Sequence, residues 1–219
     1  MDTINEAYNR HRTTLLALAG LGLLAFVIAA VVSPGRAWAN LLVGNFYFLS
    51  LALFGVVFVA LNYVLSAGWA VVFRRVPEAM SAYLPVGAAL MLALFFGRSR
   101  LYPWAEPGGL AGDPHLAHKS AYLSSPFVFL RMAVAFGIWM LFAHLLRHYS
   151  RRQDVDGNLL HTRMNKSRAV AFLLLFGATF IFASIDWLMS LEPAWYSTIF
   201  PVYCFAGLFQ AGLGFIIIL

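Results

Sequence analysis

Charged side chains are scarce in this sequence. Asp, Glu, Lys and Arg make up 11% of the 219 residues, whereas soluble globular proteins contain about 25% charged residues. Hydrophobic residues make up 62%, and the mean hydropathy is +0.78. This balance excludes an ordinary water-soluble domain and predicts a polytopic membrane protein.

Cysteine is nearly absent as well, since Cys204 is the one cysteine of the chain. A single cysteine excludes an internal disulfide, and it excludes a metal cluster held by several thiolates of this chain. Cys204 lies within an apolar run, so we interpret it as a small residue of the protein core.

Long apolar runs dominate the rest of the sequence. A helix needs about 20 apolar residues to cross about 30 Å of hydrocarbon. The runs are continuous, unlike the alternating strands of a membrane β-barrel. The sequence therefore predicts an all-α integral membrane protein, with a bundle of six transmembrane helices in one domain over residues 1–219. The predicted spans are residues 15–32, 41–65, 80–96, 126–146, 169–188 and 199–219.

The last run ends with the chain, and no basic or aromatic anchor follows it. We therefore expect further helices in the complete gene product.

The distribution of Lys and Arg predicts the orientation. The positive-inside rule favours a cytoplasmic N-terminus, because this orientation places ten basic residues inside and four outside. The net charge of +6 then mainly reflects the orientation of the chain in the membrane, and contact with anionic lipid is a secondary effect. We expect no nucleic-acid partner. The four outer residues are Arg36, Arg98, Arg100 and Lys119.

Two ionisable residues lie inside predicted spans, Arg131 near the start of the fourth and Asp186 near the end of the fifth. A charge at bilayer depth costs at least about 2.5 to 3.5 kcal/mol, so such residues usually face a protein interior and find a partner. Because the two helices run in opposite directions, both residues are expected near the outer face. The loops on that side add His115, His118, Lys119 and Glu192 to the predicted polar cluster.

Small residues predict where helices approach closely. Ala133 and Gly137 are four apart in the fourth span, and Gly207 and Ala211 are four apart in the sixth. Each pair could admit a neighbouring helix. Gln210 is expected to be a buried polar residue that makes an interhelical hydrogen bond.

Two segments carry a resemblance to a known family: DPHLAHKSAYLSSPFVFLR (residues 113–131) and DWLMSLEPAWYST (residues 186–198). Together they resemble the F subunit of bacterial alternative complex III, a quinol:cytochrome c oxidoreductase. Ser124 and Ala194 depart from the family pattern, which more often has asparagine and histidine there. That subunit is similar to NrfD-like polysulfide-reductase membrane subunits, so the resemblance implies a longer fold of about ten helices.

The resemblance also implies partners and a location. We expect a multihaem cytochrome c subunit, an iron-sulfur subunit and a second NrfD-like membrane subunit, in the bacterial cytoplasmic membrane. The haem c and iron-sulfur clusters would belong to those partners, and menaquinol or ubiquinol would be the substrate of the complex. In this chain only His144 lies within a predicted span as a possible axial haem ligand, so we expect no redox centre here.

Proton handling and structural pairing remain alternative roles for the polar cluster. Asp, Glu and His are typical proton carriers in membranes, and quinol oxidation needs an acceptor for hydroxyl protons. Arg131 and Asp186 could instead pair and hold the fourth and fifth helices together. The nearby aromatic residues are either interfacial anchors or neighbours of a quinone ring. They are Tyr122, Trp187, Trp195 and Tyr196.

Two other functional classes remain open. An ion or solute transporter would contain spans broken by Gly or Pro, and Pro85 and Pro201 are hints of that kind. A purely structural scaffold would dock redox subunits without touching protons or quinone.

Overall fold

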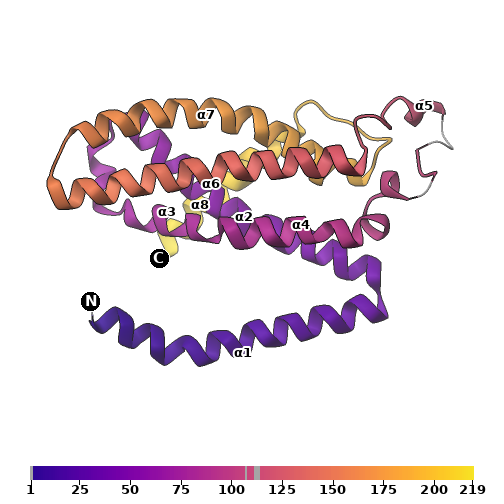
Figure 1. The fold of residues 1–219 in the computed structure, drawn as a ribbon, viewed down its shortest axis with the longest axis horizontal. Coiled ribbons are helices and arrows are strands. Elements are labelled where there is room, and N and C mark those ends of the chain that lie inside the picture. Colours follow the sequence, from indigo (N-terminus) through magenta and orange to yellow (C-terminus); the bar gives the residue numbers. More distant parts are fainter. Residues whose placement is uncertain (1, 107, 111–113) are drawn as a thin grey trace.

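The computed structural model describes residues 2–106, 108–110 and 114–219, with the side chains of residues 2–10, 114 and 115 left aside. This part of the chain is helical and contains no strand (Figure 1). Six helices in it are long and apolar enough to cross a membrane, as predicted. The six principal helices are α1 (Asp2–Val32), α2 (Pro34–Val64), α4 (Leu84–Leu101), α6 (Ser125–Asp156), α7 (Leu160–Trp187) and α8 (Phe200–Ile218).

Short helical segments connect the long ones. They are the 3-10 helices η1 (Gly68–Val72), η2 (Ser81–Tyr83), η3 (Pro103–Ala105) and η4 (Met189–Leu191), and the short helices α3 (Arg75–Met80) and α5 (Pro114–Ala117).

The third predicted span, residues 80–96, differs most from the structure. It starts at the last residue of α3, passes through the 3-10 turn η2 and continues as α4, so a 3-10 turn interrupts the α-helix in a stretch that is helical from Arg75 to Leu101. Pro85 lies in the first turn of α4 instead of its interior, and Pro201 lies in the first turn of α8. A proline is tolerated there because the first backbone N–H groups of a helix have no partner within that helix.

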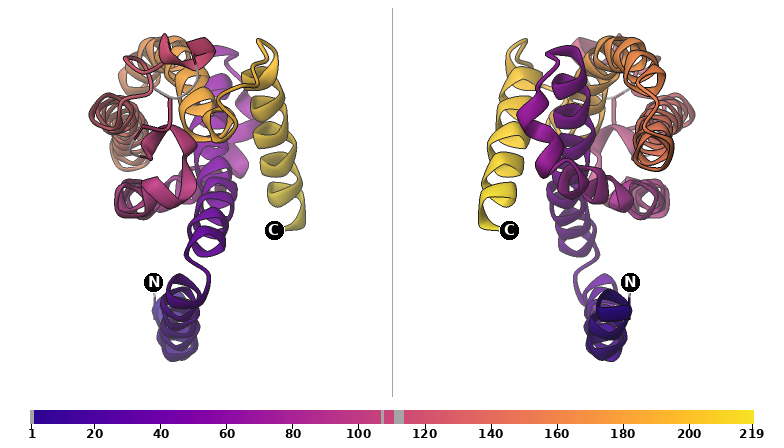
Figure 2. Two further views of the ribbon diagram at one scale, coloured as in Figure 1. Left: turned by 90° about the vertical axis from the view of Figure 1, so that its right-hand side faces the viewer. Right: turned by 90° about the vertical axis from the view of Figure 1, so that its left-hand side faces the viewer.

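Helix α2 is the centre of the bundle. It packs against α3, α4, α7 and α8, while α6 lies between α4 and α7 (Figures 1 and 2). The core around it contains large, fully buried side chains such as Phe54, Trp139 and Phe172. Asn45 of α2 is buried and fully engaged: its amide donates to the Gly87 carbonyl at 3.0 Å and accepts from the Tyr83 hydroxyl at 2.7 Å.

The bundle has two ends that differ in their connections. We call the end with residues 102–106, 108–110, 114–124 and 188–199 the loop end, and the end with the α6–α7 connection the turn end (Figure 1). The α6–α7 connection is short because Gly157 ends α6 in a left-handed conformation (φ +64°), which glycine adopts without strain. The α6–α7 hairpin therefore places the start of α6 and the end of α7 together at the loop end.

Helix α1 stands apart from the other helices (Figures 1 and 2). Its described side chains are mostly exposed, and its ring contact with the bundle is Phe26 edge-on against Trp38, with centroids 5.3 Å apart. A helix that is apolar all round and unburied has the surface of a lipid-facing segment.

The glycines that allow close helix contact are not the predicted ones. A Cβ on Gly212 would lie 2.0 Å from the Phe54 ring, and a Cβ on Gly97 would lie 2.0 Å from the Trp38 ring. By contrast, Ala133, Gly137 and Gly207 are exposed, so the two predicted small-residue strips do not mediate contacts within the described chain. Gln210 is also exposed, so the expectation of a buried polar residue was wrong. Spacing alone does not set which face of an apolar helix turns inward, because lipid accepts the other face equally well.

Gly212→Ala should destabilise the bundle by about 1 to 3 kcal/mol, because the added methyl group overlaps the Phe54 ring. Gly207→Ala is the matched control, because open space surrounds Gly207 on the same helix. Thermal unfolding of both variants in detergent micelles, followed by circular dichroism, measures the difference. Equal midpoints for the two variants would contradict the observed α2–α8 contact.

Candidate functional site

Arg131 and Asp186 meet at the loop end of the bundle. Helix α6 begins at Ser125 with Pro126 in its first turn, so Arg131 lies in its second turn. Asp186 lies in the last turn of α7, which runs antiparallel to α6. The hairpin thus brings together two residues 55 positions apart, as the sequence predicted.

The two side chains form a bidentate ion pair. Arg131 Nε donates to Asp186 Oδ2 at 2.7 Å, and Nη2 donates to Oδ1 at 3.0 Å. Nη2 also donates to the Tyr122 carbonyl at 3.1 Å, which anchors the preceding loop. Paired N–H donors on a carboxylate are among the strongest and most directional hydrogen bonds in proteins.

Aromatic rings enclose this pair. The Arg131 guanidinium carbon lies 4.1 Å from the ring centroid of Tyr122 and 4.3 Å from that of Phe127. The Asp186 side chain is 1% exposed and that of Arg131 is 15% exposed. A charge pair so poorly solvated depends on its partner, since removal of one member leaves an uncompensated charge.

A second layer of contacts fixes the end of α7. The Ser190 hydroxyl donates to the Asp186 carbonyl at 2.6 Å, and Trp104 Nε1 donates to the Ser190 hydroxyl at 3.0 Å. The Tyr102 hydroxyl donates to the Trp187 carbonyl at 3.1 Å, and the rings of Tyr102 and Trp104 stack at 4.9 Å. Sequence analysis missed Tyr102, Trp104 and Ser190. The sequence signal that could have pointed to them is the pair of aromatic residues, Tyr102 and Trp104, on either side of Pro103 just after a predicted span.

The buried carboxylate affects both tyrosines near it. Burial raises the pKa of Tyr122 to about 12, and the negative charge of Asp186 acts in the same direction. Burial, with the same negative charge, also raises the pKa of Tyr102 well above its ordinary value. Both hydroxyls therefore stay protonated at neutral pH and remain hydrogen-bond donors.

Two cavities flank the ion pair. One of about 310 Å³ lies between α6 and α7, where Arg131 and Asp186 are its polar lining and the remainder is mainly apolar. Arg131 Nη1 is buried and has no hydrogen-bond partner among the described residues. The cavity thus has a mainly apolar wall, and a buried cationic donor without a partner belongs to one of its lining residues.

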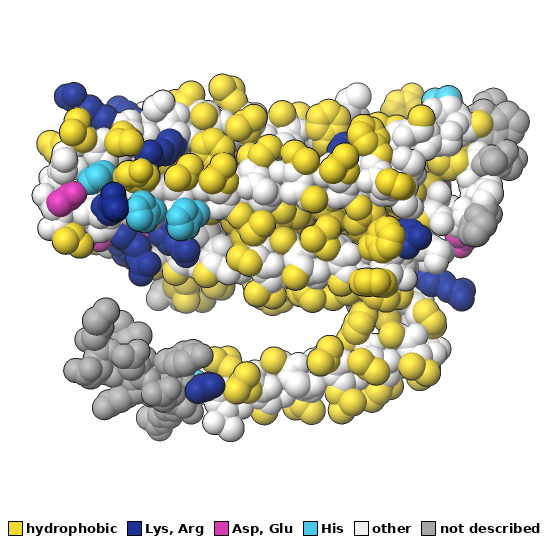
Figure 3. Space-filling model, viewed as in Figure 1, with side chains coloured by type: hydrophobic (Ala, Val, Ile, Leu, Met, Phe, Trp, Pro, Cys, Tyr) yellow, Lys and Arg dark blue, Asp and Glu magenta, His cyan; other side chains and the backbone are white. Residues whose placement is uncertain are grey.

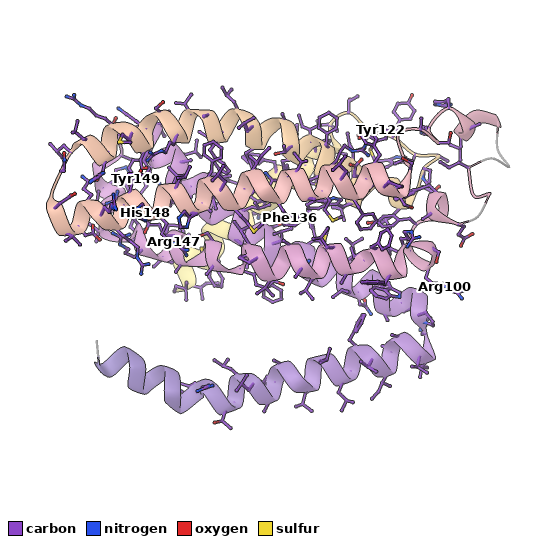
Figure 4. The ribbon with its side chains drawn as sticks, viewed as in Figure 1. Arg100, Tyr122, Phe136, Arg147, His148 and Tyr149 are labelled. Carbon is purple, nitrogen blue, oxygen red and sulfur yellow. The ribbon has the colours of Figure 1, made fainter. Side chains whose placement is uncertain are left out.

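The other cavity, of about 660 Å³, lies toward the loops. Lys119 lines this cavity, and its ammonium donates to the Pro193 carbonyl at 2.7 Å. This hydrogen bond joins the loop before α6 to the loop after α7. Figure 4 shows Tyr122 at this end of the bundle. Predicted site residues in the lining are His118, Lys119, Tyr122, Trp195 and Tyr196.

Some of the predicted site residues lie elsewhere. The Glu192 side chain is exposed, and His115 belongs to α5 by its backbone while its side chain lies outside the described residues. Trp187 is not an interfacial anchor. It is 1% exposed, stacked 5.5 Å from Phe136 at 11° and edge-on to Trp139 at 5.8 Å, because it lies on the face of α7 that turns toward α6.

Within the described part of the chain, no three His, Cys, Asp or Glu side chains gather closely enough to hold a metal ion. The side chains around the ion pair offer hydrogen bonding, ion pairing and proton exchange. Comparison with protein-family models gives no match, and a search of curated proteins finds no significant similarity.

Removal of one member of the ion pair should destabilise the protein by about 3 to 5 kcal/mol, because the other charge stays buried. Asp186→Leu and Arg131→Met test this singly, and the double variant should recover most of the loss. Asp156→Asn, which breaks a pair whose aspartate is 46% exposed, should change the stability far less. Thermal unfolding in detergent provides the comparison. A double variant no more stable than the single ones would contradict the ion-pair interpretation.

The raised pKa of Tyr122 predicts a pH dependence of stability. The pKa in the folded protein, about 12, lies above the ordinary value of 10.0. The resulting stabilisation is complete below pH 10.0 and is lost as the pH rises toward about 12. Tyr122→Phe keeps the ring over Arg131 but should lack this loss. The midpoint of thermal unfolding of the parent protein should therefore fall relative to that of Tyr122→Phe across that range; parallel curves would contradict the assignment.

Proposed function

We propose that this chain is a multi-pass subunit of a quinol-oxidising complex in the bacterial cytoplasmic membrane, similar to the F subunit of alternative complex III. Its N-terminus would be cytoplasmic and its loop end would face the periplasm. The observation that carries the proposal is the Arg131–Asp186 pair. The two segments that resemble the family, residues 113–131 and 186–198, contact each other there and at Lys119–Pro193.

The cavity between α6 and α7 suits a lipid-soluble substrate. Its rim residues Phe127, Leu130 and Phe182 are about half exposed, so a quinol headgroup could enter from the bilayer side. Arg131 Nη1 has no hydrogen-bond partner among the described residues, and it would donate to a quinol oxygen once the side chains that bury it move aside. A flat ring would also find aromatic neighbours in Phe127 and Tyr122, which already flank the guanidinium.

Asp186 would act as the proton acceptor of this site. Accepting a quinol proton neutralises the carboxylate and removes the charge that holds Arg131 in its bidentate position. Arg131 would then shift toward the Tyr122 carbonyl, which it already contacts. Proton occupancy of Asp186 and the position of Arg131 are thereby coupled, and this gives a defined step for proton release toward the loop end.

Partner subunits would supply the redox chemistry. A multihaem cytochrome c, an iron-sulfur subunit and a second NrfD-like membrane subunit would carry haem c and iron-sulfur clusters and accept the electrons of menaquinol or ubiquinol. The role of this chain is to hold those subunits at the membrane and to handle protons. In the purely structural alternative, the ion pair joins α6 to α7 and does nothing else.

A transporter is the second candidate, and the broken third span favours it. Glu78 lies at that break with 5% exposure, and its carboxylate pairs with Arg75 of the same short helix. One carboxylate oxygen of Glu78 is buried without a hydrogen-bond partner among the described residues. Discontinuous membrane helices with buried charges are typical of solute and ion transporters.

Purification from native membranes in mild detergent tests the assembly. We expect a multihaem cytochrome and an iron-sulfur subunit to co-purify at fixed stoichiometry, detected by mass spectrometry and haem staining. A lone, haem-free chain that moves a solute after reconstitution would overturn the proposal in favour of the transporter.

Asp186→Asn in the purified complex tests the proton role. Loss of one general base typically lowers turnover by about 10² to 10⁴-fold, so quinol oxidation or proton release should fall in that range. Glu106→Gln is the matched control, because Glu106 is an exposed carboxylate at the same end of the bundle. Normal turnover and proton release by an intact Asp186→Asn complex would leave only the structural role.

A further inference from the structure

A basic surface occupies the opposite end of α6 from the ion pair. His144, Arg147, His148, Arg151 and Arg152 follow one another at helical spacings of three and four residues and line one open cavity of about 480 Å³. The space-filling view shows Lys, Arg and His side chains gathered over this end of the molecule (Figure 3). Arg147 and His148 lie side by side there on α6 (Figure 4).

Three other cations at the turn end have partners. Arg75 pairs with Glu78 and Asp154, and Arg74 donates to the Tyr63 hydroxyl at 2.9 Å. Arg168 lies 3.8 Å from the centroid of the Tyr149 ring. These contacts occupy acidic and aromatic side chains at the turn end that could otherwise pair with neighbouring cations.

The cations of the basic cavity lack such partners. Asp156, the acidic residue in its lining, bonds to His161 at 2.7 Å and to the Asn158 amide at 3.0 Å. Among the described side chains, none forms an ion pair with Arg147, Arg151 or Arg152. The cavity therefore offers three guanidinium groups and two imidazoles to an outside anion.

The same face of α6 continues as an apolar strip. Leu141, Val134 and Leu130 are 55%, 52% and 59% exposed, and Gly137 between them faces open space. At 1.5 Å per residue, the strip from Leu130 to Leu141 is about 16 Å long, which is comparable with the part of an acyl chain within one leaflet. One continuous surface thus joins an exposed hydrophobic strip to a basic cavity at the helix end.

We propose that this surface binds an anionic phospholipid, with its phosphate in the cavity and an acyl chain along the strip. Arginine suits phosphate because its planar fork donates two parallel hydrogen bonds. His144 lies where the strip meets the cavity, at the depth of a glycerol or phosphate ester. A soluble phosphate compound would use the cavity and leave the strip empty, so the two parts together favour a lipid. The strip ends at Val134 and Leu130, which also line the cavity between α6 and α7, but the inference rests on the basic cavity and does not require quinol to bind there.

Native mass spectrometry of the delipidated full chain tests the proposal. The probes are dioleoyl phosphatidylglycerol, dioleoyl phosphatidylcholine and inorganic phosphate, each titrated into the protein in detergent. We expect one tightly bound phosphatidylglycerol, clearly weaker phosphatidylcholine binding, and no displacement of the lipid by millimolar phosphate. Displacement by inorganic phosphate, or equal binding of the two lipids, would overturn the proposal.

Two double variants separate a built site from general surface charge. Arg151→Gln/Arg152→Gln should weaken phosphatidylglycerol binding by roughly 30-fold. Arg163→Gln/Lys166→Gln removes the same charge from exposed positions of α7 at the same end, outside this cavity, and should change binding little. Equal losses in both variants would overturn the site. Arg152→Gln alone, expected to lose roughly fivefold, keeps the test decisive if the first double variant folds poorly.

Discussion

The ion pair between Arg131 and Asp186 organises the loop end of this protein. It joins α6 to α7 at the point where both helices leave the apolar part of the bundle. The same arginine holds the loop before α6 through the Tyr122 carbonyl, and the backbone of Asp186 receives the Ser190 hydroxyl. The loops on both sides, the cavity between them and the cavity between α6 and α7 therefore depend on one buried charge pair whose desolvation is offset by its own hydrogen bonds.

Buried polar groups elsewhere follow the same rule of local pairing. Asn45 joins α2 to the start of α4 through Tyr83 and Gly87, and Trp139 of α6 donates to the Thr179 hydroxyl of α7 at 2.9 Å. Packing of Leu, Ala and Phe alone only weakly specifies how each helix is rotated about its axis. In an apolar bundle, these few polar contacts therefore fix the relative rotation of the helices. The Arg131–Asp186 pair and the basic cavity lie toward opposite ends of α6, so this helix connects the two sites for which a function is proposed.

Much of this arrangement was predictable from the sequence. The length and continuity of the apolar runs predicted the membrane-spanning helices. The alternating direction of successive helices predicted that Arg131 and Asp186 lie at the same end of the bundle. The burial of Trp187 and the exposure of Gly137 and Gln210 were not predictable, because membrane helices are apolar on both their lipid-facing and protein-facing sides. The roles of Tyr102 and Trp104 depend on how a loop folds back over α7, and no local pattern encodes that path.

Four of the long helices, α2, α4, α6 and α8, carry a proline in their first turn: Pro34, Pro85, Pro126 and Pro201. A proline there cannot become an interior residue without loss of a hydrogen bond and a clash with the preceding turn. Lengthening α2, α6 or α8 backward by more than about one turn is therefore unfavourable. A change in membrane thickness is met more readily by tilting whole helices, and a tilt of α6 would move both of its ends at once.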